Sequence, residues 1–522
     1  MISETADAII IGAGPTGLML ALELALGGVS PVVLERLPEP DQTIKAGAIG
    51  ALAAEALERR GLGGAMDAEE AQMSAAMASM ARTVGAAGPP PWAKIGGHFA
   101  GLFLIDQTRQ REPERRLRGV RQQALERILH ERLREMGVVV KRNVEVVGHC
   151  ENEDGVTIHA RAERGDVEMR CSYLIACDGG RSATRKRAGF EFPGTDPVLT
   201  GHQAVVELDH PERLLPLGWR RTTKGMLAYG PVPGRVFTVE FDGPPADRDA
   251  PVTIAEVQES LRRVSGADVT VTAMTSATRF TDNARQAESY RKGRVLLAGD
   301  AAHVHSPFGG QGLNLGILDA VNLGWKLAAV LRGKAVEDLL DTYTSERHPV
   351  AARVLANTRA QVALMRPDAL TSAMRDIVAD LMKLDEGNRF FGEMMSGITT
   401  RYDLGLEDDR VGRLSRNVPL AGDGTLFDLM HDGSGVLMDG TSGWMKDVAN
   451  RWSSRIKVSA SGDDTSMLVR PDGCIAWVGD GPNPHGLDDA LQRWFGPENR
   501  PEQSITPTVN HRIDPLGAEP GR

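Results

Sequence analysis

The chain has 522 residues, 41% of them hydrophobic and 25% charged, which predicts an ordinary globular protein of two or three domains. Its net charge of −10 lacks the basic excess of nucleic-acid binders, so nucleic acid is not an expected partner. The four cysteines follow neither a metal-ligand spacing nor a disulfide framework. We therefore expect reduced thiols in a cytoplasmic protein and no metal site.

The N-terminal segment predicts one β-α-β unit. It begins MISETADAIIIGAG, with acidic residues where a secretory signal would carry positive charge, so export is not expected. The apolar run that follows is interrupted by glycines, Pro15 and Glu23, which argues against a membrane span. The pattern instead predicts a strand over 6–11, a helix over 16–26 and a strand over 31–34, as in a parallel sheet.

A glycine-rich turn joins the first predicted strand to its helix and has the spacing G-x-G-x-x-G. The first glycine allows a tight turn, the second lets a diphosphate approach the backbone, and the third lets helix and strand pack closely. The helix N-terminus would then face the negative charge of the diphosphate. The predicted ligands at this turn are Gly12, Gly14, Pro15, Thr16 and Gly17.

An acidic residue ends the second strand of this unit. Glu35 follows the last glycine of the turn by about 20 residues, the interval at which a carboxylate accepts hydrogen bonds from a ribose. The alternative is a solvated charge at a strand end. We include Glu35 and its neighbour Arg36 in a dinucleotide site that prefers FAD or NAD to NADP.

The middle of the chain alternates strand-like and helical patterns. Residues 78–91 are rich in small residues and proline and predict a surface excursion, whereas 124–136 predicts a helix. Short apolar runs over 138–177 predict a β-meander. Residues 198–279 are again strand-like, with one helix near 254–264, which predicts a second domain inserted into the first.

The rest of the chain predicts a return to the first domain and then a third one. A strand over 294–298 precedes long helices over 312–365. After about Thr400 the loops become rich in Gly, Asp and Ser, and Pro471-Asp472-Gly473 predicts a hairpin turn. The predicted parts are 1–185 and 286–395 (first domain), 186–285 (inserted domain), 396–500 (third domain) and 501–522 (tail).

Two further motifs accompany the glycine turn. Residues 177–185 contain D-G-x-x-S-x-x-R, and 293–303 contain a buried strand that ends in Gly-Asp. In this order the three stretches resemble the class A flavoprotein monooxygenases of the para-hydroxybenzoate hydroxylase type, most specifically over 293–327. The resemblance, strongest to the aromatic-polyketide hydroxylases, implies an α/β fold: a Rossmann-like FAD-binding domain, an inserted β-sheet substrate domain and a thioredoxin-like C-terminal domain.

The resemblance also implies roles for individual residues. The residue matching Asp300 would bind the ribityl chain of FAD, and its alternative role is a helix cap. Asp178 would lie near the diphosphate, where Arg181 and Arg185 would add positive charge. The backbone of one further loop would lie along the flavin ring, with Pro307 marking the oxygen site: its residues are Pro307, Gly310, Gly312, Leu313 and Asn314.

Several implied contacts are less direct. Gln122 matches a glutamine that contacts FAD, although it could be an ordinary polar residue at a helix start, and Val146 would border the adenine. Lys45, beside Ala46, stands where family members often have an arginine, which puts its contacts in doubt. His303 lies in a segment where structural packing is favoured over a role as a base.

The implied reaction uses tightly bound FAD, transiently bound NADPH or NADH, and O2. A second nucleotide-binding turn is not expected, because Pro484 replaces the third glycine of the one other candidate. In the family a C4a-hydroperoxide of FAD hydroxylates phenolic or quinone-like polycyclic aromatics, for example in polyketide tailoring. Baeyer–Villiger insertion, oxidative ring cleavage, a flavin dehydrogenase and a ligand-binding flavoprotein stay open as alternatives. We expect a monomer or a homodimer.

Overall fold

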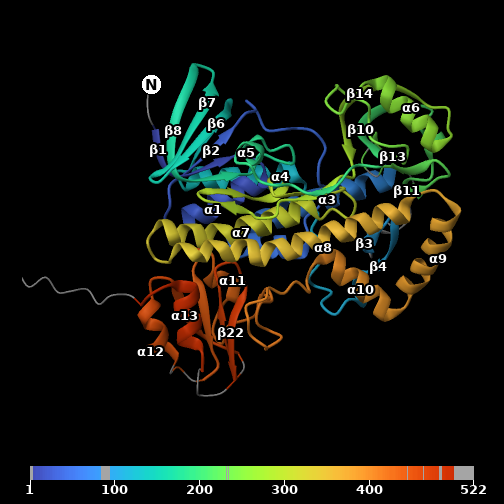
Figure 1. Cartoon of the computed structure of the whole chain (residues 1–522). Coiled ribbons are helices and arrows are strands. Elements are labelled where there is room, and N and C mark those ends of the chain that lie inside the picture. Colours follow the sequence, from blue (N-terminus) through green and yellow to red (C-terminus); the bar gives the residue numbers. More distant parts are fainter. Residues whose placement is uncertain are drawn as a thin grey trace, which may run out of the picture.

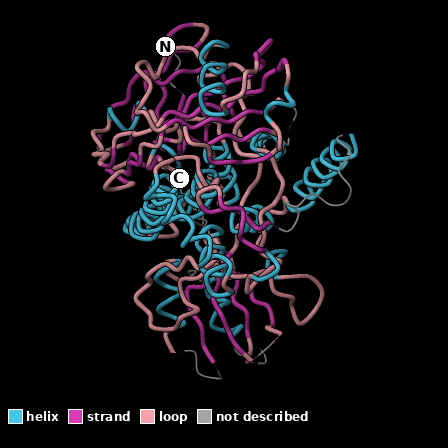
Figure 2. Tube along the Cα trace, turned by 90° about the vertical axis from the view of Figure 1, so that its right-hand side faces the viewer, coloured by secondary structure: helices cyan, strands magenta, loops and turns pink. Residues whose placement is uncertain are grey.

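The computed structural model of the chain describes residues 4–83, 95–230, 232, 234–441, 443, 445–462, 464–480 and 485–498. Two long helices, α7 (Gly312–Leu331) and α8 (Asp341–Met365), cross the middle of the molecule (Figure 1). A large sheet and a second sheet lie on one side of them, and a C-terminal sheet lies on the other. Figure 2 shows the same layering, with strands above and below the helices.

The large sheet carries the N-terminal unit. Its strands follow the order β16-β17-β8-β1-β2-β5, and β7 and β6 extend from β8. The strands of the path from β17 to β5 are parallel. Ile9 and Ile10 of β1 are fully buried in different core clusters, because the strand is covered on both faces. The bounds are β1 Glu4–Ile11, β2 Pro31–Glu35, β5 Val139–Arg142, β6 Val144–Asn152, β7 Gly155–Ala162, β8 Gly165–Ala176, β16 Arg291–Lys292 and β17 Val295–Leu297.

Helices cover one face of this sheet. Helix α1 (Pro15–Leu26) packs against α7 and against α4 (Gln122–Glu135). The other helices of this part are α2 (Ala51–Glu58), α3 (Gly63–Thr83) and α5 (Ala183–Arg187). Residues 78–83 of the predicted surface excursion form the end of α3, and the remainder of that segment lies outside the described residues.

The second sheet has the strand order β11-β12-β13-β10-β14 and is antiparallel. Because side chains alternate along a strand, it has two different faces. One face packs on α6 (Ile254–Ser265), and the other carries aromatic residues toward α8. The bounds are β10 Thr200–Asp209, β11 Gly218–Arg221, β12 Gly225–Tyr229, β13 Arg235–Glu240 and β14 Thr270–Thr281.

Short strands connect this sheet to the rest. Strands β9 (Gly194–Thr195), β15 (Ala284–Gln286) and β18 (His303–Val304) form a small sheet at the junction. The hairpin of β3 (Ile95–Phe99) and β4 (Leu102–Asp106) packs beside α9 (Ala369–Lys383) and α10 (Asp385–Ser396).

The C-terminal sheet has the order β20-β19-β21-β22. The predicted hairpin is confirmed, since β21 and β22 pair antiparallel around Pro471-Asp472-Gly473. The bounds are α11 Leu426–Leu429, β19 Gly435–Asp439, α12 Met445–Ala449, β20 Ile456–Ala460, β21 Thr465–Val469, β22 Ile475–Asp480 and α13 Leu487–Phe495. The mixed α/β class is thus confirmed, whereas the division into domains stays a prediction. The predicted tail, 501–522, lies outside the described residues.

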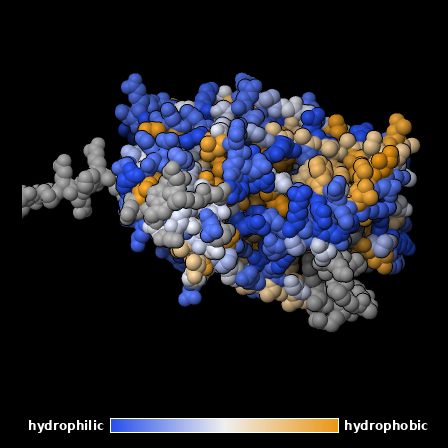
Figure 3. Space-filling view, turned by 90° about the horizontal axis from the view of Figure 1, so that it is seen from below, coloured by the Kyte–Doolittle hydropathy of each residue, from blue (hydrophilic) through white to orange (hydrophobic). Residues whose placement is uncertain are grey.

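Apolar side chains reach the surface along one pair of helices. In Figure 3 apolar surface gathers at the end of the molecule that carries α9. The exposed residues there are Leu370, Met374, Ile377, Leu381, Leu384 and Phe390. Among the described residues, we find no helix with the length and apolarity needed to span a bilayer.

Candidate functional site

Two glycines of the N-terminal turn are required by protein packing. Gly12 has φ +106°, and a Cβ placed on it would lie 2.4 Å from the carbonyl oxygen of Cys177, directly after β8. A Cβ on Gly17 would lie 2.0 Å from the carbonyl oxygen of Gly12. These contacts show the tight turn and the close approach of helix to strand that the sequence motif predicts.

Gly14 differs because open space lies in front of it. A Cβ placed there would meet no atom within 4 Å, and its φ of −77° suits any residue. It is also the N-cap of α1, and no side chain caps that helix. The first amides of α1 therefore face a space that a diphosphate would fill, which is how dinucleotide-binding turns use a helix N-terminus.

Replacing Gly14 by alanine should therefore weaken FAD binding without disturbing the fold. The added methyl group would occupy the cofactor's side of the turn, and we expect the dissociation constant to rise at least about tenfold, or 1.4 kcal/mol. Titration of the apoprotein with FAD, followed by flavin fluorescence, measures this. Gly422→Ala is the matched control, since that glycine also faces open space but lies in the C-terminal part. Equal affinities for both variants would contradict the prediction.

The second half of the site comes from the segment after β17. A Cβ on Gly299 or on Gly316 would lie 2.7 Å or 2.4 Å from the hydroxyl oxygen of Thr16. Thr16 thus joins the glycine turn of α1 to the Gly-Asp turn and to the first turn of α7. Helix α7 also lacks a side-chain cap, so its first amides, which include those of the predicted ligands Leu313 and Gly312, are free to face a ligand.

Asn314 holds the loop before α2 against this site. Its side-chain oxygen accepts a hydrogen bond from the amide of Gly50 at 2.7 Å, and its Nδ2 donates to the carbonyl of Gly310 at 2.9 Å. A Cβ on Gly310, where φ is +63°, would again meet only open space. The turn from Pro307 to Gly310, closed by an amide-to-carbonyl bond of 3.1 Å, leaves Pro307 exposed.

The predicted residues of the preceding loop lie together, although their side chains are engaged within the protein. The amide of Gln122 donates to the carbonyl of Ala46 at 2.9 Å, which sets this loop beside the start of α4. The side chain of Gln122 donates to Glu126 at 2.9 Å, and Lys45 pairs with Asp41 at 2.9 Å. These pairs match the alternative reading of Gln122 as an ordinary residue of a helix start.

Three acidic residues were predicted at the cofactor. Glu35 accepts hydrogen bonds from the amides of Ala13 (2.8 Å) and Leu37 (2.9 Å), so its carboxylate lies directly at the glycine turn. Asp178 Oδ2 accepts from the hydroxyl of Thr184 at 3.0 Å, while Oδ1 is buried without a partner among the described residues. Asp300 is exposed beside Gly299. A ligand hydroxyl could donate a hydrogen bond to this Oδ1.

Other predicted positions differ in their surroundings. Arg36 is exposed, and Val146 on β6 accepts a bond from Arg187 through its carbonyl at 3.2 Å. Arg185, which the resemblance implies as a positive charge near the diphosphate, is only 4% exposed. Its guanidinium donates to the carbonyls of Ala301 (2.8 Å) and Gly180 (3.0 Å) and lies 3.6 Å from the ring centre of Phe192. Arg185 therefore ties α5 to the Gly-Asp turn.

The sequence did not reveal a buried carboxylate that supports this turn. Asp319 on α7 is fully buried and accepts from the amide of Gly299 (3.1 Å), from His303 Nε2 (2.7 Å) and from Arg347 Nε (2.8 Å). Burial alone would raise its pKa, but Arg347 and His303 hold the pKa of this carboxyl below its usual value. His303 is fully buried, which agrees with a packing role rather than a base.

The sequence also could not show that aromatic residues gather on one face of the second sheet. Phe237 stacks on Phe280 with ring centres 5.1 Å apart, and both lie 6.3 Å from the ring of Phe308. Trp219 continues the cluster, 4.6 Å from Phe237. Phe308 and Phe237 are buried, whereas Trp219 and Phe280 are half-buried. Because Phe308 follows Pro307, this aromatic cluster begins next to the predicted oxygen site.

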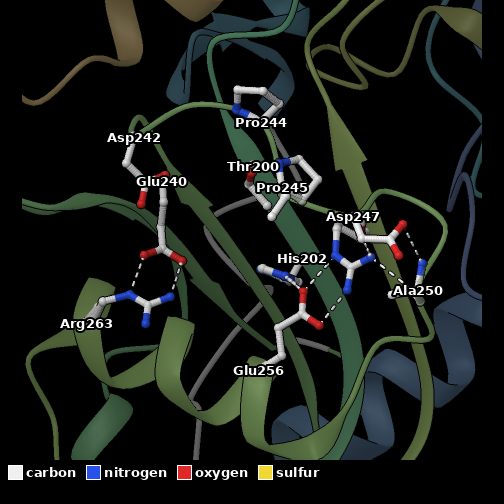
Figure 4. A pocket seen from close by; sticks show the side chains of 12 residues that line it. Thr200, His202, Glu240, Asp242, Pro244, Pro245, Asp247, Ala250, Glu256 and Arg263 are labelled. Carbon is white, nitrogen blue, oxygen red and sulfur yellow. Dashed lines mark hydrogen bonds and ion pairs between the residues drawn. The ribbon is translucent and has the colours of Figure 1, made fainter.

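A surface cavity lies on the opposite face of that sheet. It has a volume of about 410 Å³ and lies between β10, β13, β14 and α6 (Figure 4). Two ion pairs line it: Arg263 with Glu240 (2.7 Å), and Arg279 with Glu256, which also binds His202 (2.7 Å). The hydrogen bond from Arg279 lowers the pKa of Glu256 to about 2. These pairs attach α6 to the sheet, so we assign the cavity no catalytic role.

The comparisons with known proteins agree with this geometry. The FAD binding domain family matches residues 5–358, and the aromatic-ring hydroxylase C-terminal family matches 408–498. The chain belongs to the FAD-binding aromatic-ring hydroxylases. The predicted family and the cofactor FAD are thereby confirmed, and relatives named as monooxygenases confirm the monooxygenase class.

Individual relatives cover nearly the whole chain. A 12-dehydrotetracycline 5-monooxygenase/anhydrotetracycline 6-monooxygenase of Streptomyces rimosus is 39% identical over 520 residues, 94% of this chain and 99% of the relative. The structure of OxyS anhydrotetracycline hydroxylase from Streptomyces rimosus has a TM-score of 0.83 at 37% identity and covers 95% of this chain and 100% of its own. Dialkyldecalin synthase of Streptomyces rugosporus is 36% identical over 500 residues, 94% of this chain and 98% of the relative.

Proposed function

We propose that this hydroxylase uses NADPH or NADH and O2 to hydroxylate a phenolic or quinone-like polycyclic aromatic in the tailoring of an aromatic polyketide. The observation that carries this proposal is the aromatic surface that runs from Trp219 through Phe237 to Phe308, beside Pro307. Flat aromatic side chains stack on flat aromatic ligands, and the half-buried rings of Trp219 and Phe280 on one sheet face suit a polycyclic molecule. The tetracycline-oxygenating relative supports the same substrate class.

The roles of the cofactor residues follow from their positions. The amides of α1 and Gly14 would bind the diphosphate, and Glu35 a ribose. Asp178 and Asp300 would bind further hydroxyls or diphosphate-bound water, and the amides of Gly312 to Asn314 would lie along the flavin ring. Bound FAD would supply hydride acceptance from the nicotinamide and oxygen activation. The protein's own work is to orient the substrate on the aromatic surface and to exclude water there.

The C-terminal part, which we propose to be thioredoxin-like, has a different role from dithiol exchange. Its cysteine, Cys474, is buried, and burial raises its thiol pKa well above the usual value. A protonated, enclosed thiol is a poor nucleophile. A structural role, in a monomer or a homodimer, fits these facts better.

Purified holoenzyme should oxidise NAD(P)H faster when a suitable polycyclic phenol or quinone is added, and the product should contain one atom of isotopically heavy oxygen supplied as O2. Substrate-stimulated oxidation across a panel of such aromatics identifies the class that the site accepts. Mass and ring connectivity of the product distinguish hydroxylation from Baeyer–Villiger insertion or ring cleavage. A product without heavy oxygen would contradict the proposal.

A second candidate function rests on one relative. The dialkyldecalin synthase carries a name that describes ring formation rather than oxygenation, although it is 36% identical. A cyclase on the same scaffold would convert its substrate without consuming NAD(P)H or O2. Product formation under strict anaerobiosis would favour this alternative over the monooxygenase.

A further inference from the structure

One histidine extends the aromatic surface and is held in a defined position. His98 lies on β3, with its ring 4.9 Å from that of Phe103 and 5.7 Å from that of Trp219. The turn after β3 is anchored from two helices. Gln361 on α8 accepts from the amide of Ala100 at 3.0 Å, and Arg375 on α9 donates to the carbonyl of Ala100 at 2.6 Å.

Hydrogen bonding assigns the two ring nitrogens of His98. The amide of Gly101 donates to Nδ1 at 3.2 Å, so Nδ1 is the acceptor and Nε2 carries the proton of the neutral ring. Burial, together with the charge of Arg375, lowers the pKa of His98 to about 4. At neutral pH the ring is therefore uncharged and offers one N–H donor.

No acceptor for this donor is found in the part of the chain that the structure describes. Nε2 is not fully buried, and the His98 side chain as a whole is half-buried. The donor therefore keeps access to space outside the protein. Gln203 supplies a second N–H donor without a partner among the described residues. It lies on the aromatic face of β10, opposite Phe237, and its Nε2 is buried.

We propose that the Nε2–H of His98 donates a hydrogen bond to a phenol or quinone oxygen of the polycyclic substrate and so selects oxygenated rings over plain hydrocarbons. This inference rests on the proposed function. An uncharged donor suits a neutral carbonyl or phenol oxygen, and a site with an unpaired donor penalises a ligand that leaves it unpaired. His98 is thus a specificity-determining residue.

The experiment compares two flat ligands on FAD-loaded enzyme. The probes are 1,8-dihydroxyanthraquinone and anthracene, with binding followed by the change in flavin absorbance. His98→Phe keeps a flat ring and removes the donor. We expect it to weaken quinone binding about tenfold and to leave anthracene binding unchanged. His98→Gln retains an N–H donor and should recover part of the loss.

Turnover gives a second readout. For quinone-stimulated NADPH oxidation, His98→Phe should raise KM about tenfold and leave kcat within about twofold, because the interaction is made equally in the bound substrate and during reaction. If His98→Phe lost affinity for both probes equally, His98 would have a merely structural role. If the variant bound the quinone as tightly as the wild type, the inference would also be overturned. If wild-type enzyme binds neither probe, the proposed substrate class itself fails.

Discussion

Replacing Arg470 by methionine should lower the free energy of unfolding by about 3–5 kcal/mol, the cost of breaking a buried ion pair by removing one partner. Arg470 is fully buried, and its guanidinium donates to both carboxylate oxygens of Glu346 on α8, at 2.8 and 2.7 Å, and to Asp472 at 3.1 and 2.5 Å. Methionine fills the space of the aliphatic part of Arg470. The carboxylates of Glu346 and Asp472 then repel each other with less positive charge beside them.

Urea denaturation followed by tryptophan fluorescence measures this loss. Tryptophan fluorescence reports on this region directly, because the Arg470 guanidinium lies 4.4 Å from the ring centre of Trp494 and 5.4 Å from that of Trp325. Arg451→Met in the same part of the chain is the control. Its partners Asp488 and Glu498 are exposed, so we expect a loss below about 1 kcal/mol. Similar losses for both variants would show that the buried pair contributes no more than a surface one.

Replacing Asp319 by asparagine should also lower the free energy of unfolding by about 3–5 kcal/mol. It should in addition weaken FAD binding at least about tenfold. The side chain keeps its shape but loses the charge that balances Arg347, which is fully buried. Three donors converge on the carboxylate, from Gly299, His303 and Arg347. An amide presents its own NH2 group to at least one of them, whichever way it is turned, so the turn beside Asp300 must shift.

Two measurements separate the effects on stability and on cofactor. The urea midpoint reports the fold, and the FAD dissociation constant reports the position of the Gly299–Asp300 turn. Asp341→Asn serves as the control, since Asp341 forms an exposed pair with Arg291 at 2.8 Å. Destabilisation with unchanged FAD affinity would show that Asp319 supports the core but does not position the cofactor turn.

The two variants test opposite ends of one buried polar network. Glu346 and Arg347 are neighbours on α8, and Glu346 binds the C-terminal hairpin while Arg347 binds Asp319. Lys326 on α7 donates to Glu346 at 3.0 Å. The C-terminal part is thereby joined to the helices behind the cofactor turns, which gives its proposed structural role a physical basis.

The β-α-β unit, the glycine turn and the alternating second sheet could be predicted because each depends on local pattern. Gly17 needs to be a glycine because of the nearby backbone of Gly12, Gly12 itself has a positive φ, and strand periodicity separates the two faces of β10 and β13. The family motif from residue 293 added the cofactor. The extent of α3 was missed, because its small residues resemble those of a loop.

The sequence by itself therefore determined the fold class, the cofactor and the family, since these depend on spacings along the chain. Only the tertiary structure decided which side chains meet: Asp319 with Arg347, Arg470 with Glu346, and His98 with Trp219. It also showed that Arg185 is buried and donates to the carbonyl of Ala301. Such partners lie tens to hundreds of residues apart, and their pairing follows from how helices and sheets pack, which no local pattern records.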